Sequence, residues 1–209
     1  GKYAEAVQLI MERIPLPGTL GRVCPHPCES DCRRKEIDEP VSIRALKRFA
    51  ADQVNLNDLP LPAIAERPEK IAIIGSGPAG LTVAYNLRLK GFQVTIFEAL
   101  ESLGGMLRVG IPDYRLPPKI LDAEINHLLR HGITVETGRR LGRDLQSRKA
   151  LLHGAEGPAV VRVELDEVGS LGVERADVAP LARRPAGVRV LQPAQRQALG
   201  AADGGTMRI

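Results

Sequence analysis

Aromatic side chains are scarce in this sequence of 209 residues: they make up 3% of the chain, tryptophan is absent, and none follows Tyr114. Lys and Arg balance Asp and Glu over residues 1–138, so the net charge of +4 arises in residues 139–209. A nucleic-acid-binding surface usually combines clustered basic residues with aromatic rings that stack on bases. Because the basic residues here are scattered and lack such rings, we do not expect nucleic acid as a partner.

Long apolar runs are missing as well. No stretch approaches the roughly 18 residues that a membrane-spanning helix needs, and no signal-peptide pattern opens the chain. The hydrophobic share of 44% is still ample for a buried core. We therefore expect a protein without a membrane span that works in the cytoplasm.

Cysteine is rare and clustered, because the chain holds only Cys24, Cys28 and Cys32. An odd, tightly spaced set is a poor framework for disulfides, so ligation of a metal or of an iron–sulfur cluster is the better interpretation. Pro25 and Pro27 prevent a regular helix between the first two cysteines. The segment must therefore be a loop, which suits a cluster held by thiolates.

Two other interpretations of these cysteines stay open. Zinc usually takes four ligands, often from C-x2-C pairs, and that pairing is missing here. His26 lies between the cysteines, where a solvated or supporting role fits better than ligation. Thiols that bind no metal are the second alternative. The spacing favours the iron–sulfur cluster over both.

Helical spacing marks two segments in the first 55 residues. The apolar positions of the first, within residues 3–14, are Val7, Ile10, Met11 and Ile14. Ser42 is a candidate N-cap for the second helix. The apolar face of that helix would comprise Ile43, Leu46, Phe49 and Ala50. Three prolines and no periodicity follow, so we expect a small helical domain over residues 1–55 and a linker over residues 56–69.

A strand–turn–helix–strand pattern begins at Lys70. Residues 71–74 form a continuous apolar run, which is typical of a parallel strand buried on both faces. A Gly-rich turn and a helical segment follow, and a second strand is expected over residues 93–97. Prolines 117 and 118 then open another helix, which precedes a third strand over residues 133–137. This order predicts the first part of a doubly wound α/β domain over residues 70–142.

The Gly-rich turn has the features that a dinucleotide pyrophosphate needs. Gly75 permits the tight turn, Gly77 lets the main chain approach the phosphates, and Gly80 lets the following helix pack on the strand. A helix that begins near Pro78 offers free N–H groups and its positive dipole end. Glu98, at the end of the second strand, is placed to accept hydrogen bonds from the adenosine ribose. The candidate cofactor-binding residues here are Gly75, Ser76, Gly77, Pro78, Ala79, Gly80 and Glu98.

FAD and NAD use the same turn and the same acid, so the turn does not choose between them. Gly104 and Gly105 follow the second strand closely. A second glycine pair at this place would allow close approach to another part of the cofactor, which favours FAD. An ordinary glycine-containing loop is the alternative.

Two segments resemble one family. Residues 15–52, PLPGTLGRVCPHPCESDCRRKEIDEPVSIRALKRFAAD, resemble the N-terminal iron–sulfur domain of the glutamate synthase small subunit. The same domain opens dihydropyrimidine dehydrogenase and the electron-bifurcating ferredoxin:NADP oxidoreductases. Residues 70–117, which end in GGMLRVGIPDYRLP, are similar to the FAD-binding start of those proteins. The resemblance thus covers about two thirds of the chain.

The resemblance implies an NAD(P)H-dependent flavin and iron–sulfur oxidoreductase. A hydride would pass from NADPH to FAD, and single electrons would leave through a [4Fe–4S] cluster to a larger catalytic subunit or an electron-acceptor domain. Matched by motif, the implied cluster ligands are Cys24, Cys28 and Cys32. The implied FAD contacts are Gly75, Gly77, Gly80, Glu98, Gly105 and Arg108. No side chain is implied as a catalytic acid or base.

The sequence also departs from the family. Relatives have a further Cys where Leu20 stands, or a Gln or Glu where Lys47 stands, so the fourth cluster ligand is not assigned. No second GxGxxG for NADPH follows the first, and residues 143–209 do not continue the family pattern. We therefore expect a truncated or frame-shifted member. The alternatives are a non-catalytic flavin and cluster electron-transfer module and a degenerate fragment without an NAD(P)H site.

Overall fold

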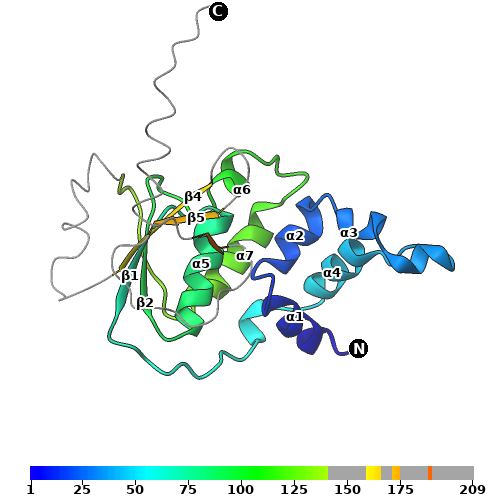
Figure 1. Cartoon of the computed structure of the whole chain (residues 1–209), viewed down its shortest axis with the longest axis horizontal. Coiled ribbons are helices and arrows are strands. Elements are labelled where there is room, and N and C mark those ends of the chain that lie inside the picture. Colours follow the sequence, from blue (N-terminus) through cyan, green and yellow to red (C-terminus); the bar gives the residue numbers. More distant parts are fainter. Residues whose placement is uncertain (141–158, 166–170, 175–187, 190–209) are drawn as a thin grey trace, which may run out of the picture.

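The computed structural model describes residues 1–140, 159–165, 171–174 and 188–189. Within these ranges the chain forms a helical N-terminal part and a sheet with helices packed on it (Figure 1). The two parts meet where helix α2 lies beside helix α7 (Figure 1). Most of residues 143–209, for which the sequence indicates a departure from the family, lie outside the described ranges.

The N-terminal part consists of short helices joined by tight loops. They are α1 (Tyr3–Met11), α2 (Pro17–Val23), α3 (Pro27–Ser30), the 3-10 turn η1 (Arg33–Glu36), α4 (Ile43–Asp52) and the 3-10 turn η2 (Leu56–Asp58). The predicted first helix is confirmed, and its Val7 and Met11 are buried. Proline stands at the first position of α2 and of α3, where its missing N–H costs nothing.

The predicted apolar face of α4 is wrong in its orientation. Of the four predicted residues only Ala50 is buried, whereas Leu46 is 58% exposed and Phe49 is 52% exposed. Close packing against α2 explains the difference, because a Cβ on Gly21 would lie 2.8 Å from the Arg48 Cα. Helix α4 therefore packs on α2 through the small Ala50 side chain and through its own backbone near Arg48. Ser42 precedes α4 as expected, but its side chain makes no capping hydrogen bond.

Six strands form one sheet in the order β3-β2-β1-β4-β5-β6. The strands are β1 (Lys70–Ile74), β2 (Gln93–Phe97), β3 (Thr134–Glu136), β4 (Ala159–Leu165), β5 (Leu171–Glu174) and β6 (Val188–Arg189). Strands β3, β2, β1 and β4 are parallel, β5 is antiparallel to β4, and β6 is parallel to β5. The order β3-β2-β1-β4 is that of a dinucleotide-binding half-fold, so the predicted doubly wound architecture is confirmed. Strand β4 lies beyond residue 142, so the sheet extends past the predicted range of 70–142.

One face of the sheet carries most of the core. The helices on this face are α5 (Pro78–Leu89) and α7 (Pro118–Leu129), and α6 (Met106–Val109) lies between them in the chain. Ile73 and Ile96 from the central strands are fully buried together with Leu81 of α5 and Leu128 of α7. Burying each such side chain contributes roughly 1.5–3 kcal/mol. The core thus holds the carboxyl ends of β1 and β2 in a fixed register.

The predicted linker of residues 56–69 is attached to both parts. Leu56 and Leu59 are buried in the main core. Further along, Glu66 forms a salt bridge with Arg88 of α5, and the Arg67 guanidinium lies 4.8 Å from the centre of the Phe92 ring. None of the helices in the described part of the chain is long and apolar enough to cross a bilayer.

Two histidines, His127 near the end of α7 and His131 just after it, are buried between the helices. His127 is 3% exposed, His131 is 5% exposed, and their ring centroids lie 5.2 Å apart. The His131 ring also packs edge-to-face on Tyr85, at 5.0 Å. Within the described residues, His127 Nδ1 has no hydrogen-bond partner. Burial and the neighbouring imidazole lower the pKa of His127, so the folded protein keeps this ring neutral.

The lowered pKa predicts acid sensitivity. Below pH 6.5, the ordinary value, the unfolded chain binds a proton on His127 that the folded chain does not, so the free energy of unfolding falls as the pH drops. His127→Phe keeps an aromatic ring and should make this fall shallower, the remainder being due to His131, whose pKa burial also lowers. At pH 8 the variant should lose only the hydrogen bond with the Leu56 backbone, about 1 kcal/mol. Urea unfolding followed by circular dichroism at pH 8 and pH 5.5 measures both effects. Parallel pH curves for the two proteins would contradict this account.

Candidate functional site

The Gly-rich turn lies at the carboxyl end of β1, where doubly wound folds bind ligands. Gly75 adopts a φ of +91°, a region that favours glycine, and Gly77 is the N-cap of α5. The first hydrogen bond of the helix runs from Leu81 N–H to the Gly77 carbonyl, at 2.9 Å. The N–H groups of Ala79 and Gly80 precede it and are available at the positive end of the helix. The turn therefore has an anion-binding geometry.

The glycines of the turn differ in what surrounds them. A Cβ on Gly80 would lie 2.0 Å from the Gly75 carbonyl oxygen, so α5 packs on the turn at a distance that only glycine allows. A Cβ on Gly77 would meet nothing within 4 Å. Gly80 thus serves the packing of the protein, and Gly77 borders the open space that a ligand would occupy.

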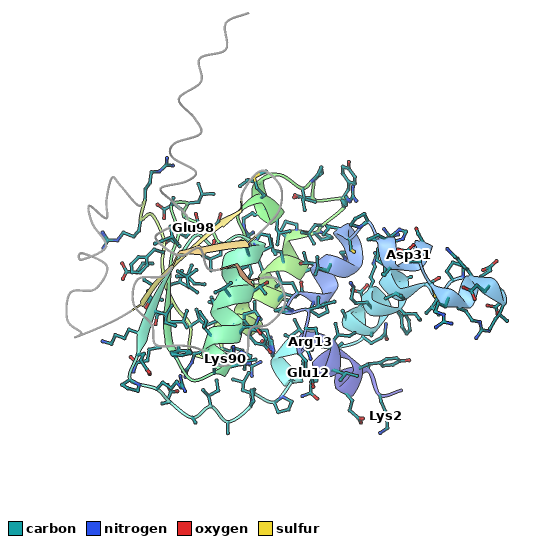
Figure 2. The ribbon with its side chains drawn as sticks, viewed as in Figure 1. Lys2, Glu12, Arg13, Asp31, Lys90 and Glu98 are labelled. Carbon is teal, nitrogen blue, oxygen red and sulfur yellow. The ribbon has the colours of Figure 1, made fainter. Side chains whose placement is uncertain are left out.

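Glu98 is held by the turn itself. Its Oε2 accepts hydrogen bonds from Ser76 N, at 2.8 Å, and from Ser76 Oγ, at 2.5 Å. Its Oε1 accepts from Leu100 N at 2.9 Å. Although burial acts in the opposite direction, these hydrogen bonds prevail and lower the pKa of Glu98, so the side chain is a carboxylate. Figure 2 shows Glu98 at the opposite end of the sheet from Lys90, which follows α5.

This geometry limits the predicted ribose contact. A carboxylate has about four acceptor positions, and at least three of those on Glu98 are used within the protein. The side chain is only 6% exposed. At most one acceptor position, at Oε1, is left for a ribose hydroxyl. The contribution of Ser76 could not be found from the GxGxxG pattern, because any residue fits its second position.

The glycine pair after β2 packs directly on the Gly-rich turn. A Cβ on Gly105, whose φ is +51°, would lie 2.9 Å from the Gly77 Cα. Gly104 N donates to the Ser76 carbonyl at 3.1 Å. The pair was predicted to approach a second part of the cofactor. The structure adds a reason within the protein, since two backbone turns touch here and Gly105 has no room for a side chain.

Arg108, a predicted FAD contact, is fixed by its neighbours. Its Nε donates to the Leu103 carbonyl at 2.5 Å, and its Nη2 pairs with Asp122 of α7. The guanidinium therefore ties the loop after β2 to α7. Asp122 was not among the predicted site residues, because a single acid on a helix gives no signal in the sequence.

The three cysteines lie in one irregular segment, as predicted. Cys24 follows the last residue of α2, Cys28 lies in the single turn α3, and Cys32 precedes η1. All three are free thiols, and none is buried. Figure 2 shows Asp31, the neighbour of Cys32, in the helical part, well away from Glu98.

Backbone amides donate to two of the three sulfur atoms, those of Cys24 and Cys32. His26 N donates to Cys24 Sγ at 3.4 Å. Hydrogen bonds from the backbone of Val41 and of Arg34 lower the pKa of Cys32, which favours its thiolate. His26 pairs with Glu29 through an Nδ1–Oε2 distance of 3.1 Å, in keeping with a supporting role.

The donor set fits an iron–sulfur cluster in its chemistry. Accessible thiols with nearby amide donors are the ligands that such a cluster takes, and three of the usual four are present here. In the described part of the chain, no group of three His, Cys, Asp or Glu side chains is arranged to hold a single metal ion. A cluster differs from a single ion because each thiolate binds a different iron atom. The ligand roles of Cys24, Cys28 and Cys32 thus stay a prediction.

A cavity of about 380 Å³ lies elsewhere on the sheet. Its lining residues include Lys70, Gln93 and Thr134, which are the first residues of β1, β2 and β3. In doubly wound folds ligands bind at the opposite, carboxyl ends of the strands. The dinucleotide turn is therefore the better candidate site.

Comparison with known proteins assigns both parts of the molecule. Residues 1–59 match the family described as dihydropyrimidine dehydrogenase domain II, 4Fe-4S cluster. Residues 73–138 match the NAD(P)-binding Rossmann-like domain family. A 4Fe-4S domain is thus followed by a Rossmann-like domain, which confirms the predicted order.

Three curated relatives agree with this assignment. The NADP(+)-dependent formate dehydrogenase subunit beta of Moorella thermoacetica is 45% identical and aligns with 69% of this chain and 24% of its own length. The NADPH-Fe(3+) oxidoreductase subunit beta of Geobacter sulfurreducens is 42% identical, over 69% and 22%. The glutamate synthase [NADPH] small chain of Bacillus subtilis is 37% identical, over 69% and 30%.

This chain is a homologue of these oxidoreductase subunits. The predicted resemblance to the glutamate synthase small subunit and to dihydropyrimidine dehydrogenase is therefore confirmed. The chain spans between about a fifth and a third of the length of these relatives, so it corresponds to one portion of them.

We expect the substitution of alanine to affect mainly FAD affinity at Gly77 and mainly stability at Gly80. Gly77→Ala places a methyl group in open space with an ordinary φ of −66°, so stability should change by less than about 1 kcal/mol. If the pyrophosphate contacts this residue, affinity for FAD should fall roughly tenfold or more. Gly80→Ala should instead destabilise the fold by about 1–3 kcal/mol through overpacking.

Urea unfolding and titration of flavin fluorescence separate the two effects. Unchanged FAD affinity in Gly77→Ala would show that the turn is not the contact. Unchanged stability in Gly80→Ala would show that α5 does not pack on Gly75 as described.

Proposed function

We propose that this chain is the flavin- and cluster-binding portion of an NAD(P)H-dependent FAD/iron–sulfur oxidoreductase subunit. One observation carries the proposal: a dinucleotide turn and a cysteine segment of the 4Fe-4S type lie in a single packed unit, joined through α2 and α7. In an electron-transfer protein, such packing sets the separation of the two cofactors.

FAD is the dinucleotide that we assign to the turn. The glycine pair at 104 and 105 lies against Gly77, so a cofactor on the turn would also border the loop after β2. The helix end would face the pyrophosphate, and Glu98 Oε1 would accept from the ribose. The chain contains a single GxGxxG turn. If FAD occupies it, NAD(P)H needs another surface.

The [4Fe–4S] cluster is assigned to the cysteine segment. Cys24, Cys28 and Cys32 would supply three thiolates, and the backbone amides around them would stabilise the negative charge. The fourth ligand is left open. When both groups are bound, FAD supplies hydride chemistry and the cluster supplies one-electron transfer. The protein's own residues then bind, orient and shield these groups, and no side chain is needed as an acid or base.

The partner is part of the proposal. The relatives are named as subunits or as a small chain. By analogy, we propose that the electrons pass to a larger catalytic subunit or an electron-acceptor domain. The three free thiols suit the reducing environment of the cytoplasm, where we place the protein.

A non-catalytic module is the second candidate. It would bind FAD at the single GxGxxG turn of the given residues, and a cluster at the cysteines, without reacting directly with NAD(P)H. The two candidates share the same cofactors and differ only in their response to the nicotinamide.

Absorbance spectroscopy of the anaerobically purified chain tests both candidates. Flavin bands on a broad iron–sulfur background are expected in either case. Bleaching by NADPH supports the oxidoreductase, whereas bleaching by dithionite alone supports the module. A folded protein that stays colourless after reconstitution with FAD, iron and sulfide would refute both.

Cys28→Ser should remove the iron–sulfur absorbance and the bound iron while FAD is retained, because one thiolate ligand is lost far from the dinucleotide turn. Ser30→Ala, a change of similar size in the same turn, is the control and should keep the iron. Iron analysis together with the absorbance spectrum measures the result. Full iron content in Cys28→Ser would refute its role as a ligand.

A further inference from the structure

A buried carboxylate joins the two parts of the molecule. Glu124, on α7 of the Rossmann-like part, is 2% exposed. Its Oε1 accepts a hydrogen bond from Gly18 N at 2.5 Å, and its Oε2 accepts one from Thr19 N at 2.8 Å. Both donors are N–H groups in the first turn of α2, in the helical part. More than a hundred residues of sequence separate the carboxylate from these donors.

The contact depends on the carboxylate. The first N–H groups of a helix have no partner within the helix, and the helix dipole favours a negative charge beside them. Burial raises the pKa of Glu124, and the hydrogen bonds from α2 oppose that rise. If the two parts separated, the carboxylate and the N–H groups of the helix end would lose these hydrogen bonds, and each would need water as its partner.

Glycines let α2 fit tightly between its neighbours. A Cβ on Gly18 would lie 3.0 Å from Glu124 Oε1, and a Cβ on Gly21 would lie 2.8 Å from the Arg48 Cα of α4. On its far side, Arg22 of α2 also pairs with Asp52 at 2.7 Å. Helix α2 is therefore held on both sides, and small shifts of its position are opposed by backbone contacts.

The other end of α2 leads directly to the cysteine segment. Cys24 is the C-cap of this helix, and its N–H donates to the Leu20 carbonyl at 3.2 Å. A helix of seven residues is roughly 10 Å long and does not bend easily. The first predicted cluster ligand therefore directly follows the helix whose first turn Glu124 binds.

Helix α7 also contacts the dinucleotide turn region. Asp122, two residues before Glu124, pairs with Arg108 of the loop after β2. A Cβ on Gly104 would lie 3.0 Å from Leu121 Cδ2 of α7. Helix α7 therefore contacts the loop that packs on the dinucleotide turn, and it also carries the carboxylate that binds α2.

We propose that Glu124 is a positioning residue that sets the distance and orientation of the cysteine segment relative to the dinucleotide turn. The relevance to electron transfer rests on the proposed function, because the rate of electron tunnelling between two cofactors falls steeply with their separation. The contact of Glu124 with the N–H groups of Gly18 and Thr19, which we call the clamp, is a property of the fold. It can be tested without cofactors.

Hydrogen–deuterium exchange tests the clamp in the chain as purified. Glu124→Gln replaces one acceptor oxygen with an NH2 group that faces an N–H donor. The amides of α2 should exchange roughly tenfold faster, as expected for the loss of one charged hydrogen bond, while the amides of β1 and β2 keep their protection. Glu12→Gln makes the same chemical change at an exposed side chain and should leave α2 unchanged.

Gly18→Ala tests the same contact from the other partner, because its added Cβ would lie 3.0 Å from Glu124 Oε1 and would push the carboxylate away by a few tenths of an ångström. This variant also decides the matter if Glu124→Gln does not fold. Unchanged exchange of α2 in whichever of the two variants folds would refute the clamp. Faster exchange throughout the sheet would also refute it, since Glu124 would then be a general stabilising residue.

A second readout separates positioning from stability. In the protein loaded with FAD and cluster, the flavin is photoreduced with EDTA as the electron donor, and the transfer of an electron to the cluster is followed by absorbance. Glu124→Gln should slow this transfer about tenfold or more, with FAD affinity unchanged. An unchanged rate in folded protein would overturn the positioning role. If the wild type binds neither group, the proposed function fails, and the exchange experiment still decides on the clamp.

Discussion

The close approach of α5 to the end of β1 is the constraint on which the rest of the site depends. Gly80 allows the helix to begin against the Gly75 carbonyl, at a distance that excludes any side chain. This approach sets the shape of the turn, which in turn places Ser76 on Glu98 and Gly77 against Gly105. The dinucleotide site is therefore a stack of three backbone segments with very few side chains between them.

Helix α7 extends this constraint to the rest of the molecule. Its apolar face packs on the sheet, Asp122 holds the loop after β2, and Glu124 holds the helical part. The cysteine segment follows directly from the helix that Glu124 binds. Two candidate cofactor sites far apart in the sequence thus share one supporting helix, as the proposed electron transfer between them would require.

Much of this architecture could be predicted from residue patterns. The continuous apolar run of β1, the glycines of the turn and the acid after β2 are local signals, and the structure confirms the elements that they predicted. The apolar residues of α4 misled the prediction, because periodicity identifies a face but not which neighbour covers it. Strand β4 lies beyond the predicted range of 70–142, since its pairing with β1 depends on a contact between distant segments.

Short sequence motifs establish which chemistry is available: a phosphate-binding turn, a carboxylate and three clustered thiols. Local patterns suffice for this, because backbone conformation and ligand type are properties of short segments. The tertiary structure alone decided that Glu98 is largely occupied by Ser76, that Arg108 pairs with Asp122, and that Glu124 joins the two parts. Each of these contacts joins residues that only packing brings together, and a side chain's partners depend on what packing places within reach.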